Sequence, residues 1–312
     1  MRKNIYKYLK IYEDLGSKAI EVFRYIFTLL ALVFVYLKLK GGFSSEMFEV
    51  LVLNISNSVQ LSSLLFVILF GVVHHWTDAL IWKRILNREF SVSIFQALSM
   101  NWTSLAYSFY SPGRVLDIPS KVLLLDKLES KFKWKASTLY NLLKPLSTLI
   151  LGLYSITFLL TDNWTIPLVL FFVIWMMIIF SWPFKFFDKL IEIFPYWSRN
   201  EISMLIGLNC MRVLFLTAEH ICILLILRFE FPLGDLFLYL LLIHTLVTFI
   251  PQIAGTEILV KSYLCFYFLQ IDLHSGAELI LGSSVLILWI VNVLFPVLIG
   301  LIQQKKAVLK FE

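Results

Sequence analysis

Residues 277–302 read AELILGSSVLILWIVNVLFPVLIGLI, and the chain carries no charged residue between Glu278 and Lys305. A helix that crosses a membrane needs about 20 mainly apolar residues, because the hydrocarbon core is about 30 Å thick. The stretch is long enough. Its apolar residues also run without alternation, which argues against a strand of a membrane barrel. The sequence therefore predicts a membrane-spanning helix here.

Five further stretches of the chain have the same character. They are residues 20–37, 59–82, 136–160, 164–184 and 202–228. Hydrophobic residues make up 59% of the 312 residues and charged residues only 15%, whereas a soluble domain usually has about 25% charged residues. This composition excludes a soluble enzyme. We expect an all-α polytopic membrane protein with about six full spans.

Three other apolar stretches are too short or too interrupted to be ordinary spans. They are residues 93–111, 235–250 and 255–270. The first stops at Pro112 and Gly113, and the second stops at Pro251, shortly before Gly255. Because proline and glycine interrupt helices, we predict two broken hairpins. They cover residues 93–125 and 235–270.

The basic residues predict the orientation of the chain. Most of the 27 Lys and Arg residues lie near the two termini and in the segments 83–88, 112–135 and 185–199. Cytoplasmic loops carry such an excess, so we expect an inner-membrane protein with both termini in the cytoplasm. Residues 93–111 then have cytoplasmic loops on both sides and should re-enter, with residues 115–125 as the return arm. The second hairpin either re-enters from the outside or crosses as a pair of spans.

The chain divides into three parts on this reading. Residues 1–19 have apolar residues at helical spacing opposite Lys3, Lys7 and Lys10, which favours an amphipathic helix on the membrane surface. Residues 20–302 form a single transmembrane domain, and residues 303–312 form a cytoplasmic tail. The three cysteines lie singly in apolar stretches, so we expect neither a disulfide nor a metal site, and no cofactor.

The two predicted breaks resemble each other. In each, a proline is followed within six residues by an acid, and a lysine follows the acid four positions later. These pairs are Asp117 with Lys121 and Glu257 with Lys261. The two acids are separated by the same number of residues as the two lysines. Interrupted helices in matching places are typical of transporters built from inverted repeats, and the pattern favours such a repeat.

Three short motifs resemble a known family. They are Trp82-Lys83-Arg84-Ile85-Leu86, then Ser111-Pro112-Gly113-Arg114 with Asp117 and Lys121, and then Pro251 through Glu257. Residues 60–302 are similar to the integral-membrane domain of the lysylphosphatidylglycerol synthase family, which implies translocation of aminoacylated or other lipids, or a role in glycolipid and envelope assembly. The family usually has Gly-Glu and then Arg where this chain has Leu116-Asp117 and then Lys121. Lys144 stands where the next helix usually has arginine.

Ionisable residues inside spans are costly, by about 2.5–3.5 kcal/mol on insertion scales, and each suggests a functional site. The candidates for substrate binding are Arg114, Asp117, Lys121, Lys144, Arg212, Glu219, Glu257 and Lys261. We expect the cations to compensate a lipid phosphate and the two hairpin acids to hold them in place. The first hairpin's charges should lie near the cytoplasmic surface, where water solvates them. Lys144 contacts either a headgroup or one of the acids Asp117 and Glu257.

The histidines offer no metal-ligand spacing. His74 and His75 with Asp78, together with His220 and His244, are predicted to make hydrogen bonds between helices or at the interface.

These residues favour a lipid translocator, of flippase or scramblase type, that binds a headgroup between the two hairpins. The predicted partners are anionic or aminoacylated phospholipids or a polyprenyl-linked glycolipid, together with a separate soluble transferase, and no nucleic acid. Glu257 and Glu219 are also the candidates for proton coupling. The alternatives are a membrane enzyme acting on a lipid-linked phosphate, which would use Asp117 or Glu257 as base or metal ligand, and a non-catalytic scaffold. The sequence has no catalytic motif, and no soluble lysyl-transferase domain follows residue 302, so it favours a transporter over an enzyme.

Overall fold

The computed structural model describes six segments of the chain. They are residues 58–109, 116–125, 128–161, 192–250, 256–269 and 277–307. All of them belong to the second of two compact units, Leu53–Glu312. The predicted surface helix 1–19, the predicted spans 20–37 and 164–184, and both predicted helix breaks lie outside the described residues.

All the secondary structure within these segments is helical. The elements are α3 (Ser58–Leu86), α4 (Ile94–Ser108), α5 (Asp117–Leu124), α6 (Ser130–Thr161), α9 (Arg199–Ile226), α10 (Leu233–Phe249), α11 (Thr256–Phe268), α12 (Ala277–Trp289), η2 (Ile290–Leu294) and α13 (Phe295–Ala307). The element η2 is a π-helical turn that joins α12 to α13. Capping boxes begin two of the helices, with Ser93 and Gln96 before α4 and Ser198 and Glu201 before α9.

Four of the described helices are long and apolar enough to cross a membrane. They cover Ser62–Leu86, Ser130–Leu160, Arg199–Ile226 and Ile280–Gln303. Each coincides with a stretch that the sequence predicts to span, so the prediction of an all-α membrane protein is confirmed in the described part of the chain. The predicted arms of the broken hairpins are also helices, namely α4 and α5 in the first and α10 and α11 in the second.

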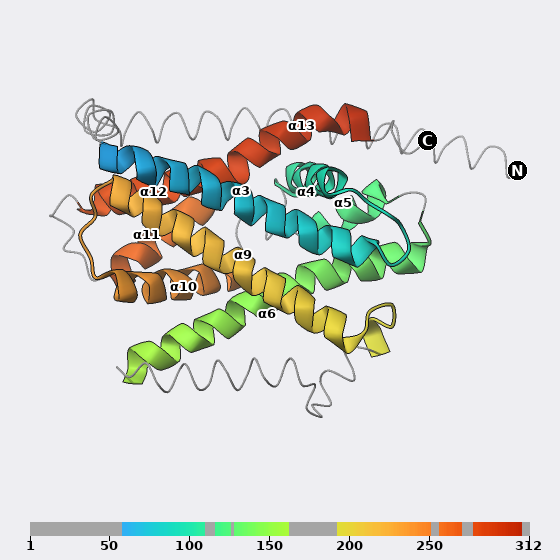
Figure 1. The fold of residues 1–312 in the computed structure, drawn as a ribbon, viewed down its shortest axis with the longest axis horizontal. Helices are drawn as coiled ribbons and strands as arrows, with labels where there is room; N and C mark the ends of the chain where they lie inside the picture. Colours follow the sequence, from blue (N-terminus) through green and yellow to red (C-terminus); the bar gives the residue numbers. More distant parts are fainter. Residues whose placement is uncertain are drawn as a thin grey trace, which may run out of the picture. The chain divides into compact units, whose positions relative to one another are not determined.

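The long helices α3 and α9 lie side by side, and α6 packs against both (Figure 1). Their contact buries a core that includes Trp82 of α3, Tyr140 of α6 and Trp197, which precedes α9. The indole of Trp197 donates to the main-chain carbonyl of Ile85, at 3.2 Å. This end of the bundle is therefore fixed by large aromatic side chains.

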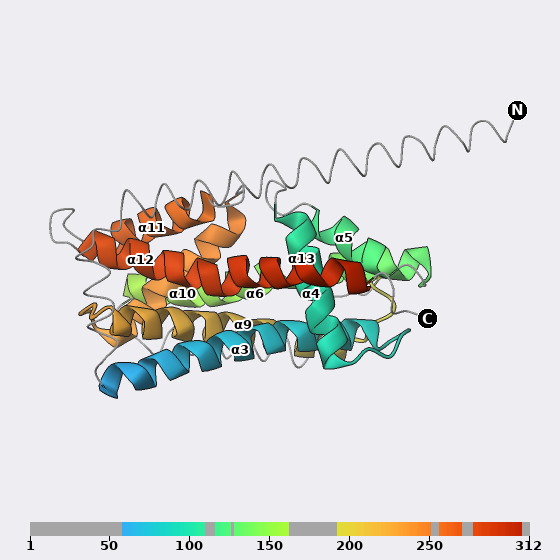
Figure 2. The same cartoon turned by 90° about the horizontal axis from the view of Figure 1, so that it is seen from above.

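The first hairpin packs at the same end. Figure 2 shows α4 running across the direction of α3 and α13, with α5 beside it. Gly300 of α13 lies so close to α4 that a Cβ there would overlap the main-chain carbonyl of Trp102. The absence of a side chain at Gly300 is what allows this close crossing.

The second hairpin packs toward the other end of the long helices, as both views show. Helix α10 contacts α6, α9 and α11, and α11 also contacts α12. Thr245 of α10 donates to the main-chain carbonyl of Thr148 of α6, at 2.8 Å. The two hairpins therefore supply their charges to different places in the bundle.

Candidate functional site

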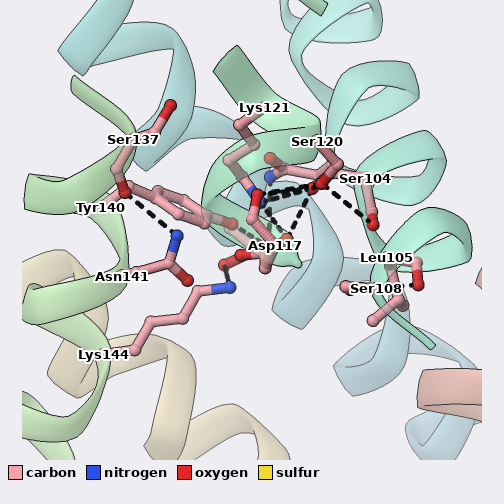
Figure 3. A network of polar contacts seen from close by, with 12 residues as sticks. Ser104, Leu105, Ser108, Asp117, Ser120, Lys121, Ser137, Tyr140, Asn141 and Lys144 are labelled. Carbon is pink, nitrogen blue, oxygen red and sulfur yellow. Dashed lines mark hydrogen bonds and ion pairs between the residues drawn. The ribbon is translucent and has the colours of Figure 1, made fainter. Parts of the chain in front are cut away.

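Asp117 and Lys121 form a buried ion pair within α5. Nζ of Lys121 lies 2.6 Å from Oδ1 of Asp117, and the spacing of four residues places both on one face of the helix (Figure 3). Ser104 of α4 reaches both: its hydroxyl donates to Oδ1 of Asp117 at 2.5 Å and accepts from Nζ of Lys121 at 3.1 Å. The pair therefore ties α5 to α4.

The ammonium of Lys121 also faces aromatic rings. It lies 4.6 Å from the ring centroid of Tyr140 and 5.9 Å from that of Trp82, within the range of a cation–π contact. Only 2% of Lys121 is exposed. The prediction that these charges lie where water solvates them is wrong, because protein atoms compensate both. Lys121 has the surroundings of a structural cation.

Asp78 of α3 lies at the centre of a second set of contacts. The hydroxyl of Tyr140 donates to its Oδ2 at 2.6 Å, and Nδ2 of Asn101 donates to the same oxygen at 3.1 Å. Its other oxygen, Oδ1, faces two cations: Nζ of Lys144 at 3.5 Å and Nε of Arg212 at 3.8 Å. Side chains from α3, α4, α6 and α9 thus meet at one carboxylate.

The two cations near Asp78 keep unused hydrogen-bonding capacity. Within the described residues, neither Oδ1 of Asp78 nor Nε of Arg212 has a hydrogen-bond partner. The ammonium of Lys144 lies 4.2 Å from the ring centroid of Tyr140 (Figure 3), and 27% of the Lys144 side chain is exposed. The carboxylate that forms an ion pair with Lys144 is Asp78, which the prediction did not name as its partner, and the charge of Asp117 also acts on Lys144.

This cluster has more positive than negative charge. In the part of the chain that the structure describes, the carboxylates of Asp78 and Asp117 face the cations Lys121, Lys144 and Arg212. A buried charge without a partner is costly, so an excess cation favours an anion beside it. Because Lys121 is already compensated, Lys144 and Arg212 are the cations whose charge an additional anion would balance.

The remaining candidates gather elsewhere on α9 and around it. Both carboxyl oxygens of Glu219 accept from Nδ2 of Asn292 in η2, at 2.9 and 3.0 Å. Lys261 of α11 is 6% exposed, and the charges of Glu257 and Glu219 both act on it. Glu219 and Arg212 lie on the face of α9 that packs against α3, as their spacing predicts, but they join different clusters.

The sequence prediction identified some members of the Asp78 cluster and missed others. Asp117, Lys121, Lys144 and Arg212 come together as cluster residues. Asp78, Tyr140 and Asn101 are additional members, and Asp78 was predicted only to make interface or interhelical hydrogen bonds beside His74 and His75. Arg114, Pro112, Gly113, Pro251 and Gly255 lie outside the described residues. The signal for Asp78 was a single acid within a predicted span.

The described segments contain no group of three or more His, Cys, Asp or Glu side chains that could hold a metal ion.

Replacing Ser104 with alanine tests the link between α4 and α5. The change removes hydroxyl contacts to Asp117 and Lys121, and a buried group that loses its partner costs about 1–3 kcal/mol. We expect Ser104→Ala to lower the free energy of unfolding by about that amount in a denaturant titration in detergent. The control Ser91→Ala, at an exposed loop position, should stay within about 0.5 kcal/mol of the wild type. Equal stability of the two variants would contradict the buried linkage.

Comparisons with known proteins add no relative: no family model, curated protein or solved structure matches this chain.

Proposed function

We propose that the protein translocates lipids, in the manner of a flippase or scramblase, and that Lys144 and Arg212 bind the headgroup phosphate. The observation that carries the proposal is the single carboxylate oxygen of Asp78 that faces both cations without a hydrogen bond from either. Two cations held close together but not saturated are suited to receive an anion. A guanidinium, in particular, matches the geometry of a phosphate.

The roles within the cluster follow from the contacts. Asp78 compensates the charge of the two cations when no lipid is bound. The hydrogen bonds from Tyr140 and Asn101 hold Asp78 in place. Asp117 and Lys121 compensate each other and fasten α5 to α4. An anionic headgroup then contacts Lys144 and Arg212, while its acyl or prenyl chains stay in the bilayer.

The position of the cluster fits a site between two hairpins. Lys144 and Arg212 lie in the middle parts of α6 and α9. Helix α5 packs against α6, and α10 packs against both α6 and α9. The contact of α10 with α6 includes the hydrogen bond from Thr245 to Thr148, one turn beyond Lys144.

The proposal includes about six spans with two re-entrant hairpins, an inverted repeat, an inner-membrane location and cytoplasmic termini. It also includes membership of the lysylphosphatidylglycerol synthase family, whose motifs the sequence resembles.

The test is native mass spectrometry of the lipids that the purified protein retains. We expect wild-type protein to retain one anionic lipid class above its level in the bulk membrane. Arg212→Gln and Lys144→Gln should each reduce that retention about 10-fold or more, because a hydrogen bond to a charged group contributes about 1.5–3 kcal/mol.

The matched control is Lys131→Gln, which removes a cation from an exposed position of α6. It should leave the retained lipids unchanged. A lipid profile equal to that of the bulk membrane in the wild type, or equal loss in all three variants, would refute the headgroup site.

A further inference from the structure

A buried carboxyl group lies two turns along α9 from Arg212. Glu219 is 0% exposed, and its only hydrogen-bond donor in the described part of the chain is the neutral amide of Asn292. No cation of the described residues forms an ion pair with it. An ionised carboxylate is costly in such a place, because a neutral amide compensates little of the charge. The surroundings of Glu219 therefore suit an uncharged acid.

The unpaired oxygen of Asn292 points to the same state. Its Oδ1 is buried and has no hydrogen-bond partner among the described residues. An ionised Glu219 only accepts hydrogen bonds and has no proton to offer this oxygen. Nδ2 now lies 2.9 and 3.0 Å from the two carboxyl oxygens and also donates to the main-chain carbonyl of Leu288 at 3.1 Å. After a rotation of the Asn292 amide, a protonated Glu219 can donate its O–H to Oδ1 while Nδ2 donates to the other carboxyl oxygen, which gives a closed pair of two hydrogen bonds.

We propose that Glu219 is a proton-binding site, formed as an acid–amide pair with Asn292, and that its protonation is coupled to lipid movement. Binding adds one proton to the carboxylate, and release returns it, with no other bond changed. The coupling rests on the proposed function, whereas the proton site does not.

The helices around Glu219 leave room for this pair. A Cβ at residue 71 of α3 would lie 3.1 Å from Oε1 of Glu219, so glycine at that position lets the carboxyl group approach the helix. Asn292 belongs to the π-helical turn η2, and such turns are frequent at functional sites. The acid and its partner are thus placed by two local features of the backbone.

Lys261 of α11 and Cys222 of α9 are the titratable groups that interact electrostatically with Glu219. The surrounding helices carry further titratable and charged side chains, namely His74, His75 and Asp78 of α3, Arg212 and His220 of α9, His244 of α10, and Glu257 and Cys265 of α11. Nε2 of His220 lies 3.1 Å from Oγ of Ser284, and the rings of His220 and His244 are 5.7 Å apart. Lys261 is the cation whose charge acts on Glu219 through space. This attraction favours the ionised acid, and Lys261 therefore acts against the binding of a proton at Glu219.

Infrared difference spectroscopy between acidic and alkaline pH tests the proton site on purified protein. We expect the wild type to show a carbonyl band of a protonated carboxylic acid that is absent from Glu219→Gln, isolated by subtracting the spectrum of the variant from that of the wild type so that the other acids cancel. Asn292→Leu should shift the band to higher frequency, because the acid loses its hydrogen-bonded partner. The control Glu230→Gln removes an exposed carboxyl group and should keep the band.

Identical spectra of the wild type and Glu219→Gln in this carbonyl region would overturn the proposal. If Glu219→Gln does not fold, Asn292→Leu decides: a shifted band supports the pair, and an unshifted band refutes it. The spectra need no lipid, so their outcome is separate from that of the headgroup site.

The coupling is measured as movement of fluorescent phosphatidylglycerol in proteoliposomes. A proton gradient should accelerate this movement in the wild type and not in Glu219→Gln. Movement that is the same with and without the gradient in the wild type would refute the coupling. A wild type that moves no lipid would refute the proposed function and leave the proton site to the spectra.

Discussion

Asp78→Ala is expected to lower the free energy of unfolding by about 3–5 kcal/mol, the cost of removing one partner from a buried ion pair. Asp78 is the carboxylate that faces both Lys144 and Arg212, and its second oxygen accepts from Tyr140 and Asn101. Its removal leaves two cations and two hydrogen-bond donors without their acceptor. Equilibrium unfolding in detergent measures the loss.

The control for this variant is Asp235→Ala. Asp235 is exposed in the first turn of α10, where a carboxylate contributes about 0.3–1 kcal/mol through the helix dipole. Adding Arg212→Leu to Asp78→Ala should recover part of the lost stability, since one of the two unpaired cations is then gone. No recovery would mean that the cost comes from the lost contacts with Tyr140 and Asn101. Equal stability of Asp78→Ala and Asp235→Ala would contradict the central place of Asp78.

Gly300→Ala is expected to destabilise the protein by about 3 kcal/mol, the upper end of what overpacking usually costs. A Cβ at this position would overlap the main-chain carbonyl of Trp102. Backbone atoms cannot move aside as the end of a side chain can, so α4 and α13 have to separate. The same separation displaces Asn101 and Ser104, which belong to α4 and contact the acids of the charged cluster. The measurements are thermal unfolding and retained lipid.

Gly282→Ala in α12 is the matched control, because nothing lies within 4 Å of a Cβ built there. Alanine has the higher helix propensity by about 0.8–1.0 kcal/mol, so this variant should be as stable as the wild type or slightly more stable. Similar stability of the two alanine variants would show that the crossing of α4 and α13 is not a tight contact.

Much of the helical architecture was predictable, because it depends on local properties of the chain. The predicted spans 59–82, 136–160 and 202–228 correspond to α3, α6 and α9. Apolar length and flanking polar residues determine such elements without reference to the rest of the fold. The pairing of Asp117 with Lys121 was predictable for the same reason, since residues four apart on a helix are neighbours.

The cluster itself was only partly predictable, because its members meet through packing between helices. The position of Lys144 in the sequence does not show which acid lies opposite it, and the prediction named a headgroup, Asp117 or Glu257 as its contact, but not Asp78. The burial of Lys121 depends on Trp82 and Tyr140, which come from two other helices. Contacts of this kind depend on how whole helices are placed.

The turn η2 has a consequence for the rotational phase of the last long helix. Each residue of an α-helix turns the chain by about 100°, so a turn of different pitch changes which side every later residue faces. Asn292 reaches Glu219 of α9, while Gly300, farther along, contacts Trp102 of α4. Deleting one residue from Ile290–Leu294 would leave the composition almost unchanged and put one of these two contacts out of phase. The number of residues in this segment is therefore as constrained as their identity.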